Sequence, residues 1–234
     1  MHEFADAFAT ALRLIGSLDP DLVEIVGLSL RVSLLAVLAA ALVGLPLGAA
    51  LAAFRFPGRR AVVIALNAMM GLPPVVVGLV IYLLLSRSGP LGTLGLLFTP
   101  TAMIVAQAVL ITPIVAALTR QTVEDLLVEY DDLLRVLGAG PLATIATLLA
   151  EARLSLATTV LAGFGRASAE VGAVMIVGGN IDHVTRVMTT AIALETSRGD
   201  LPLALGLGFI LIVLSLAVNA GVSLIRDAAR RSFA

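Results

Sequence analysis

The 234-residue chain is 59% hydrophobic and only 13% charged, and its formal net charge is −1. Soluble domains carry about 25% charged residues, so this composition excludes an ordinary soluble domain and indicates an integral membrane protein. A net charge near zero identifies no partner by itself, and we expect none that is a nucleic acid.

Two residue types are missing, and their absence excludes several kinds of site. All fifteen basic residues are arginine, whereas a P-loop needs a lysine to reach the β and γ phosphates of a nucleotide. The chain also has no cysteine, which excludes disulfides and thiolate metal sites. His2 and His183 are too far apart in sequence to give a metal-ligand spacing. We therefore expect no catalytic, cofactor or metal site in this chain.

The first segment of the chain, residues 3–17, predicts an amphipathic helix with Phe4, Phe8 and Ile15 on its apolar side. It has too few apolar residues and too many charges to cross a bilayer. We expect this helix to lie at the membrane interface.

Five membrane spans are predicted after this segment. Four uncharged runs reach the length of about twenty residues that a bilayer crossing requires, and a fifth run is interrupted by Arg166 and Glu170. Internal repeats are not apparent, so we expect one all-α membrane domain over residues 1–234. The runs are residues 32–54, 61–86, 98–119, 154–177 and 201–225.

The placement of arginines predicts the orientation of the chain. The loops after the first, third and fifth runs are rich in arginine, whereas the short loop after the second has only Arg87. The positive-inside rule then places the N-terminus outside and the C-terminus in the cytoplasm. Arg186 and Arg198 go against this trend, in a long outer loop where we expect a short helix at about residues 187–196. The cytoplasmic arginines are Arg55, Arg59, Arg60, Arg120, Arg135, Arg153, Arg226, Arg230 and Arg231.

A polar break at residues 129–141 separates two apolar halves and falls on the predicted cytoplasmic side. The apolar spacing predicts a short helix with a narrow apolar stripe and charged residues opposite. Gly138, Gly140 and Pro141 should end this helix. The pattern alone fits either a helix that lies on the lipid surface or a helix to which a soluble partner protein binds. The stripe is Leu126, Tyr130, Leu133, Leu134 and Leu137, and the charged side is Glu129, Asp131, Asp132 and Arg135.

Polar and proline residues inside the spans are the other candidates for function. Pro73-Pro74 predicts a kink in the second span, either for packing or as a bend that lines a pathway. Arg166 and Glu170 lie deep in the fourth span, where charges are costly unless they pair or face water. Their i, i+4 spacing allows a structural ion pair on one helix face, or a site on the pathway. Glu24 and Arg31 on the first span can pair or snorkel at the outer interface. Asn67, Gln107, Thr112 and Asn219 should bond between helices.

The polar break resembles the coupling loop of ABC-transporter permease subunits. The pattern of that family is Glu-Ala-Ala, three residues, Gly, nine residues, then Ile-x-Leu-Pro. Here Asp132-Leu133-Leu134 takes the Glu-Ala-Ala place and Gly138 takes the glycine place. Leu148 and Ala150 stand where Ile and Leu belong, and Glu151 stands where Pro belongs.

Flanking stretches resemble the molybdate and tungstate permeases of the same family, in the right order between about residues 22 and 230. They are Leu-Ser-Leu-Arg-Val-Ser at 28–33, Phe-Pro-Gly at 56–58, Leu-Pro-Pro-Val-Val-Val-Gly at 72–78, and Gly-Arg-Ala-Ser-Ala-Glu-Val-Gly-Ala at 165–173. Residues 170–200, with Gly-Gly-Asn-Ile at 178–181, are most similar to the tungstate branch.

This resemblance implies a type I ABC importer permease with five core spans and an N-terminal interfacial helix, in a bacterial or archaeal cytoplasmic membrane. Two copies would form the pore, and ATPase subunits that hold ATP and Mg would dock on the loop at about residues 126–152. An extracytoplasmic binding protein would deliver a tetrahedral oxyanion, tungstate first, with molybdate or sulfate as alternatives. The residues expected to couple the permease to the ATPase are Tyr130, Asp131, Asp132, Leu133, Leu134, Arg135, Leu137 and Gly138. Those expected to line the translocation pathway or its gate are Pro73, Pro74, Arg166 and Glu170.

Two rival functions come from other classes. A secondary transporter could use Arg166 and Glu170 as a proton-linked site, but inverted repeats that would support it are not apparent. An intramembrane enzyme would need a Ser/His or metal pair within the spans, and the sequence offers none.

Overall fold

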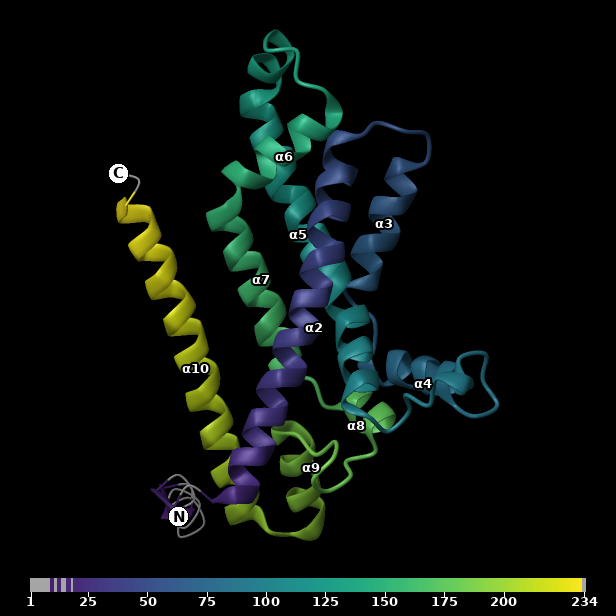
Figure 1. The fold of residues 1–234 in the computed structure, drawn as a ribbon, viewed down its shortest axis with the longest axis vertical. Coiled ribbons are helices and arrows are strands. Elements are labelled where there is room, and N and C mark those ends of the chain that lie inside the picture. The colour runs from purple at the N-terminus through teal and green to yellow at the C-terminus, as the bar shows by residue number, and fades with distance from the viewer. Residues whose placement is uncertain (1–8, 11, 14–15, 18, 233–234) are drawn as a thin grey trace. The chain divides into compact units, whose positions relative to one another are not determined.

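The computed structural model describes residues 9–10, 12–13, 16–17 and 19–232. Every regular element in this part of the chain is a helix (Figure 1), which confirms the all-α prediction. The interfacial helix predicted at residues 3–17 lies largely outside the described residues. The described helices are α2 (Pro20–Ala53), α3 (Arg59–Met69), α4 (Pro74–Leu85), the 3-10 helix η1 (Gly92–Leu94), α5 (Pro100–Val136), α6 (Pro141–Glu151), α7 (Arg153–Ser168), α8 (Gly172–Gly178), α9 (Met188–Arg198) and α10 (Leu201–Ser232).

Several of these helices have the length and apolar character of membrane spans. Three qualify singly: α2, α5 and the Leu201–Leu224 part of α10. The count reaches five if the pairs α3–α4 and α6–α7 each form one broken span. Five spans is also the predicted number, but the prediction places the fourth at residues 154–177 and misses α6 as part of it.

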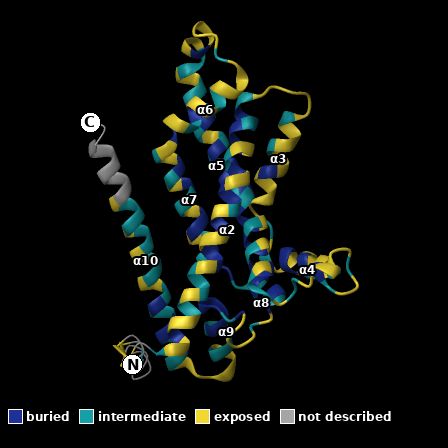
Figure 2. Cartoon of the chain, viewed as in Figure 1, coloured by how far each residue is buried: buried dark blue, intermediate teal, exposed yellow. Residues whose placement is uncertain are grey.

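Many residues along these helices are exposed (Figure 2), and several of them are large and apolar. On α2, Leu42 is 69% exposed and Val43 is 57% exposed. Such a surface is far too apolar for water, because burying apolar area stabilises a protein by about 25 cal/mol per Å². It is the surface that a bilayer covers.

The chain divides into two compact units, each assembled from separate segments. Unit 1 comprises residues 1–35, 73–107 and 167–234, and unit 2 comprises residues 36–72 and 108–166. Both α2 and α5 contribute residues to each unit. The assignment of residues 1–234 to one permease domain stays a prediction.

In unit 2, α2 packs closely against α5 at a glycine. A Cβ on Gly48 would overlap the carbonyl oxygen of Ala116 and lie 2.8 Å from Cβ of Thr119. Only glycine allows the two backbones to approach this closely. Further along, a buried cluster joins α2, α5 and α6 through Ala49, Ala52, Val123, Leu134 and Leu148.

In unit 1, α9 packs between α10 and the first turns of α2. Its first residue, Met188, is fully buried and donates its backbone N–H to the hydroxyl of Ser29 at 2.8 Å. The helix confirms the short helix predicted at about residues 187–196, and its place on the outer side stays a prediction. The buried residues of this cluster are Leu22, Met188, Ala191, Leu207 and Ile210.

Candidate functional site

The polar break forms a helical hairpin from the end of α5 and from α6. α5 runs without interruption from Pro100 to Val136, so the separate short helix predicted at the polar break is wrong. Those residues are the last turns of a long helix. Residues 120–136 contain no glycine or proline, and most are good helix formers, so nothing stops the helix before its end.

The turn of the hairpin has the geometry that its glycines and proline predict. Gly138 has φ +69°, a left-handed conformation that favours glycine. The N–H of Ala139 donates to the carbonyl oxygen of Leu134 at 2.9 Å, which closes the end of α5. Pro141 then begins α6, where its missing N–H and fixed φ are tolerated.

The predicted apolar stripe divides into a buried half and an exposed half. Leu134 is 8% exposed and lies in the buried cluster of unit 2, with Leu126 and Tyr130 packed against it. Leu133 and Leu137 are 53% and 71% exposed. Residues four apart share one helix face, which explains why 126, 130 and 134 stay together. The exposed half joins Val136 and Leu142, 86% and 80% exposed, in an apolar tip.

The charged side of the hairpin is partly paired. Arg135 Nη2 lies 2.7 Å from Asp131 Oδ2, an i, i+4 ion pair on the helix surface. Asp132 is exposed. The structure therefore presents the predicted coupling residues on one projecting hairpin, and their role in coupling stays a prediction.

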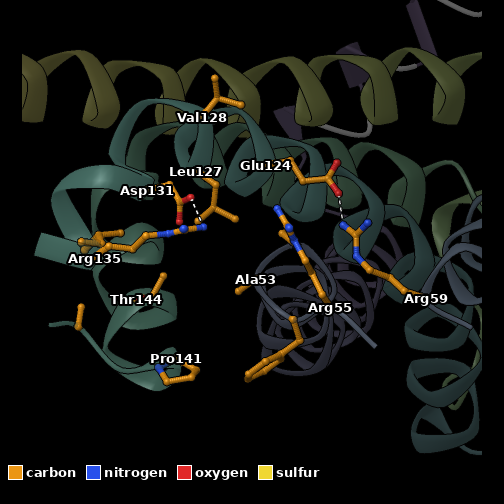
Figure 3. Close-up of a pocket in the computed structure, with 14 residues that line it drawn as sticks. Ala53, Arg55, Arg59, Glu124, Leu127, Val128, Asp131, Arg135, Pro141 and Thr144 are labelled. Atoms are coloured by element: carbon orange, nitrogen blue, oxygen red, sulfur yellow. Dashed lines mark hydrogen bonds and ion pairs between the residues drawn. The ribbon is translucent and has the colours of Figure 1, made fainter. Parts of the chain in front are cut away.

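A pocket of about 720 Å³ lies between this hairpin and the end of α2 (Figure 3). Its charged lining consists of three arginines and two carboxylates, which leaves one net positive charge. In the sequence, Arg55 and Arg59 indicate only the orientation of the chain, and no sequence pattern predicts this pocket. No local signal joins Arg59 to Glu124, which is 65 residues away. The charged lining is Arg55, Arg59, Glu124, Asp131 and Arg135, and the apolar lining includes Ala53, Phe54, Leu127, Val128 and Pro141.

Glu124 organises one wall of the pocket. Its two carboxylate oxygens accept hydrogen bonds from Arg59 and Arg120 respectively. Arg59 Nε also donates to the carbonyl oxygen of Leu51 at 2.6 Å. Hydrogen bonds between charged groups are stronger than neutral ones, so Arg59 at the start of α3 ties α2 to α5.

Pro73 and Pro74 lie at a helix break and not within one kinked span. α3 ends at Met69, Pro73 caps the next helix in an extended conformation, and Pro74 is the first residue of α4. Two consecutive prolines remove two backbone donors, and each disfavours the helical conformation of the residue before it. The helix therefore stops and restarts, which corrects the prediction of one kinked helix at residues 61–86.

Arg166 and Glu170 do not lie on one helix, so the predicted i, i+4 placement is wrong. α7 ends at Ser168 and α8 begins at Gly172, with Glu170 between them. Glu170 is 3% exposed. Its Oε1 accepts the N–H of Ala173 at 3.0 Å, and its carbonyl oxygen accepts the hydroxyl of Thr189 at 2.8 Å.

The break at Glu170 lies close to the break at Pro73-Pro74, so two of the predicted pathway segments meet. A Cβ on Gly172 would lie 2.9 Å from Val75 Cγ2, so α8 begins against the first turn of α4. Glu170 and Pro74 flank this contact in the sequence. Helix breaks at membrane depth persist only where protein or a water-filled cavity surrounds them.

The polar residues predicted to bond between helices behave differently from one another. The buried Gln107 of α5 donates to the carbonyl oxygen of Ala167 in α7 at 3.2 Å, which confirms the prediction. Thr112 and Asn219 instead donate to the carbonyl one turn earlier in their own helices, so the prediction is wrong for them.

A second polar cluster joins the start of α2 to the segment before α9. His183 Nδ1 lies 2.9 Å from Glu24 Oε2, so Glu24 contacts a histidine and not Arg31, the partner in one of the two predicted alternatives. The hydrogen bond to Glu24, and then the charge of Asp182, raise the pKa of His183 above its usual 6.5. No sequence pattern connects the two residues, which are 159 positions apart.

Long apolar helices, two broken helix pairs and a projecting charged hairpin define a multi-pass membrane transport subunit. Residues 44–233 match the family described as the binding-protein-dependent transport system inner membrane component. The chain belongs to this family of ABC-transporter permeases, which confirms the resemblance seen in the sequence.

Individual relatives are similar over nearly their whole length. The chain is 44% identical to the tungstate uptake system permease protein TupB of Peptoclostridium acidaminophilum, over 94% of this chain and 96% of the relative. It is 43% identical to a probable anion ABC transporter permease protein of Haloferax volcanii, over 88% and 91%. It is 37% identical to TupB of Campylobacter jejuni, over 92% and 90%.

Proposed function

We propose that this chain is the membrane permease subunit of an ATP-driven importer of tungstate, a tetrahedral oxyanion. The strongest support is the 44% identity to a tungstate uptake permease across 94% of the chain. The matched stretch of 220 residues is long enough to cover the pathway segments as well as the coupling hairpin. Molybdate and sulfate are the alternative substrates, because their permeases belong to the same family.

The subunit works with partners. Two copies form the pore, and an extracytoplasmic binding protein delivers the oxyanion to the outer face, where the N-terminus lies. ATPase subunits hold the ATP and Mg and dock on the hairpin from the cytoplasm. The absence of lysine from the chain supports a separate ATPase. So does the apolar tip, since Leu137 and Leu142 are 71% and 80% exposed and suit a protein contact.

Coupling runs along α5. A 37-residue helix without a break joins the hairpin to the span that begins at Pro100. A displacement of the hairpin by the ATPase is therefore passed to the membrane by one continuous element. The helix breaks at Pro73-Pro74 and at Glu170 form the part of the pathway that opens and closes, because broken helices have fewer backbone hydrogen bonds to hold them in one arrangement.

Reconstitution tests this function. Proteoliposomes containing the chain, its ATPase and its binding protein should accumulate tungsten, measured by mass spectrometry, only with ATP and Mg on the ATPase side. Excess molybdate or sulfate in the assay measures selectivity. The chain purified alone should show no ATP hydrolysis above background. ATPase activity from this chain alone, or uptake driven by a proton gradient without ATP, would overturn the assignment.

A further inference from the structure

The pocket between α2 and the hairpin contains one cation that its own carboxylates do not neutralise. Glu124 accepts hydrogen bonds from Arg59 and Arg120, and Asp131 pairs with Arg135. Among the described residues, no carboxylate pairs with Arg55. Figure 3 shows the Arg55 side chain extending into the pocket toward α5.

The length of α5 places the far end of the pocket beyond the lipid. The 37 residues of this helix span about 55 Å, and Arg120 lies about 30 Å from Pro100, one hydrocarbon thickness. Asp131 and Arg135 are a further 16 to 23 Å along the helix, by about 1.5 Å per residue. The headgroup layer adds only about 5 to 8 Å on each side. The end of the pocket at Asp131 and Arg135 therefore lies beyond the lipid headgroups, within reach of a cytoplasmic protein.

The lining also selects the chemistry of the occupant. Half of it is apolar, including Phe54, Leu127 and Val128, and Val128 is 89% exposed. Arg55 is the lining cation for which the described residues provide no carboxylate partner, so it can pair with one added carboxylate. An acidic side chain next to an apolar one satisfies both parts of the lining.

We propose that the pocket receives an acidic side chain, flanked by an apolar side chain, from the ATPase subunit, and that Arg55 is its ion-pair partner. This inference rests on the proposed function. The ATPase contact then extends past the hairpin tip to the end of α2. Because Glu124 ties α3 to α5, and Arg59 ties α3 to α2, the ATPase holds three helices of unit 2 and not only the coupling hairpin.

Charge reversal tests the ion pair in the reconstituted system. Arg55→Glu should weaken binding of the ATPase to the nanodisc-embedded permease by about tenfold or more, and should reduce the salt dependence of that binding. Arg60→Glu is the matched control, because Arg60 is exposed, lies only five residues after Arg55 and is outside the pocket lining. Its effect should stay below about twofold, the size expected of a remote surface charge. Equal losses in the two variants, or none in either, would overturn the inference.

A cross-linking experiment identifies the occupant. The chain has no cysteine, so Arg55→Cys carries a single attachment point for a short photoreactive maleimide. Cross-linking to an ATPase peptide that contains Asp or Glu supports the inference. Cross-linking to lipid, or protection by tungstate in the absence of the ATPase, overturns it. If the unsubstituted permease binds no ATPase at all, the proposed function fails, whereas binding unaffected by Arg55→Glu removes only this inference.

Discussion

At the residue scale, the contact between α2 and α5 depends on a missing side chain. A Cβ on Gly48 would meet the backbone oxygen of Ala116, which cannot move without moving α5. Gly48→Ala should therefore lower the free energy of unfolding by about 1–3 kcal/mol, the usual cost of overpacking. Thermal unfolding of the protein in detergent measures the effect.

Gly27 on the same helix provides the control for Gly48. A Cβ on Gly27 would meet nothing within 4 Å. Gly27→Ala should leave stability unchanged or raise it by up to about 1 kcal/mol, because alanine is the better helix former. Equal destabilisation by both substitutions would mean that close approach at Gly48 is not the cause.

The contact between His183 and Glu24 should depend on pH. The raised pKa of His183 means that protonation stabilises the folded contact. This stabilisation is fully present below the unfolded pKa of 6.5 and is lost as the pH rises through the folded value. The charged groups around the ring are Asp21 and Glu24 on α2, and Asp182 and Arg186 on the segment before α9.

Nuclear magnetic resonance of the histidine ring measures this pKa directly, with His2 as the second signal. In Glu24→Gln the pKa of His183 should fall toward 6.5, because the hydrogen bond to Glu24 is its largest cause. Arg31→Gln serves as a control on the same helix, since Glu24 contacts His183 and not Arg31. An unchanged pKa in Glu24→Gln would show that the contact does not form in solution.

At the element scale, the sequence predicts which segments are helical better than it predicts where each helix ends. Apolar runs identify α2, α5 and α10, and Gly138 and Pro141 identify the turn of the hairpin. The sequence does not predict that α5 continues through residues 120–136. The charged residues there indicate a separate short helix, whereas they form the last turns of α5. The pocket is missed for a different reason: Arg59 and Glu124 meet only through tertiary packing, which no local spacing reports.

The turn of the hairpin makes a specific prediction. Gly138→Val should weaken ATPase association and lower transport without preventing membrane insertion. The left-handed conformation costs a residue with a Cβ about 1–2 kcal/mol, and more for a branched side chain. Gly140→Val is the control, since Gly140 has φ −70° and open space around it. Normal assembly and normal transport rate in Gly138→Val would rule out a coupling role for the turn.

The break between α7 and α8 makes another prediction. Glu170→Gln keeps an acceptor for the N–H of Ala173, so the amount of folded protein should stay near normal. Glu170→Ala leaves that buried N–H without its acceptor, which costs about 1–3 kcal/mol. Folded yield after detergent extraction distinguishes the two variants.

The same variants separate a hydrogen-bonding role from an ionic one. If an ion pair with Arg166 dominates, Glu170→Gln should fold as poorly as Glu170→Ala, and adding Arg166→Ala should restore folding. If the double variant folds and also transports tungstate normally, neither residue belongs to the gate. If it folds without transport while the ATPase remains active, the gate assignment is supported.

At the scale of the whole molecule, the distribution of arginine predicts the orientation of the chain across the membrane. Nine arginines fall in the predicted cytoplasmic segments, against three in the predicted outer loops. The hairpin and the pocket both lie in predicted cytoplasmic segments. Docking of the ATPase, and binding of its acidic side chain in the pocket, therefore depend on this orientation. The orientation itself is independent of the family assignment, because it rests on charge alone.

Cysteine labelling in intact cells tests that orientation, because the chain has no cysteine of its own. Ser197→Cys, on the exposed end of α9, should react with a membrane-impermeant maleimide added from outside. Leu137→Cys, at the exposed tip of the hairpin, should react only after the membrane is permeabilised. Both positions are exposed in the single chain, and the assay uses cells without the ATPase subunit, so that docking does not cover Leu137→Cys. Labelling of Leu137→Cys in intact cells would invert the orientation and remove the basis for docking an ATPase on the hairpin.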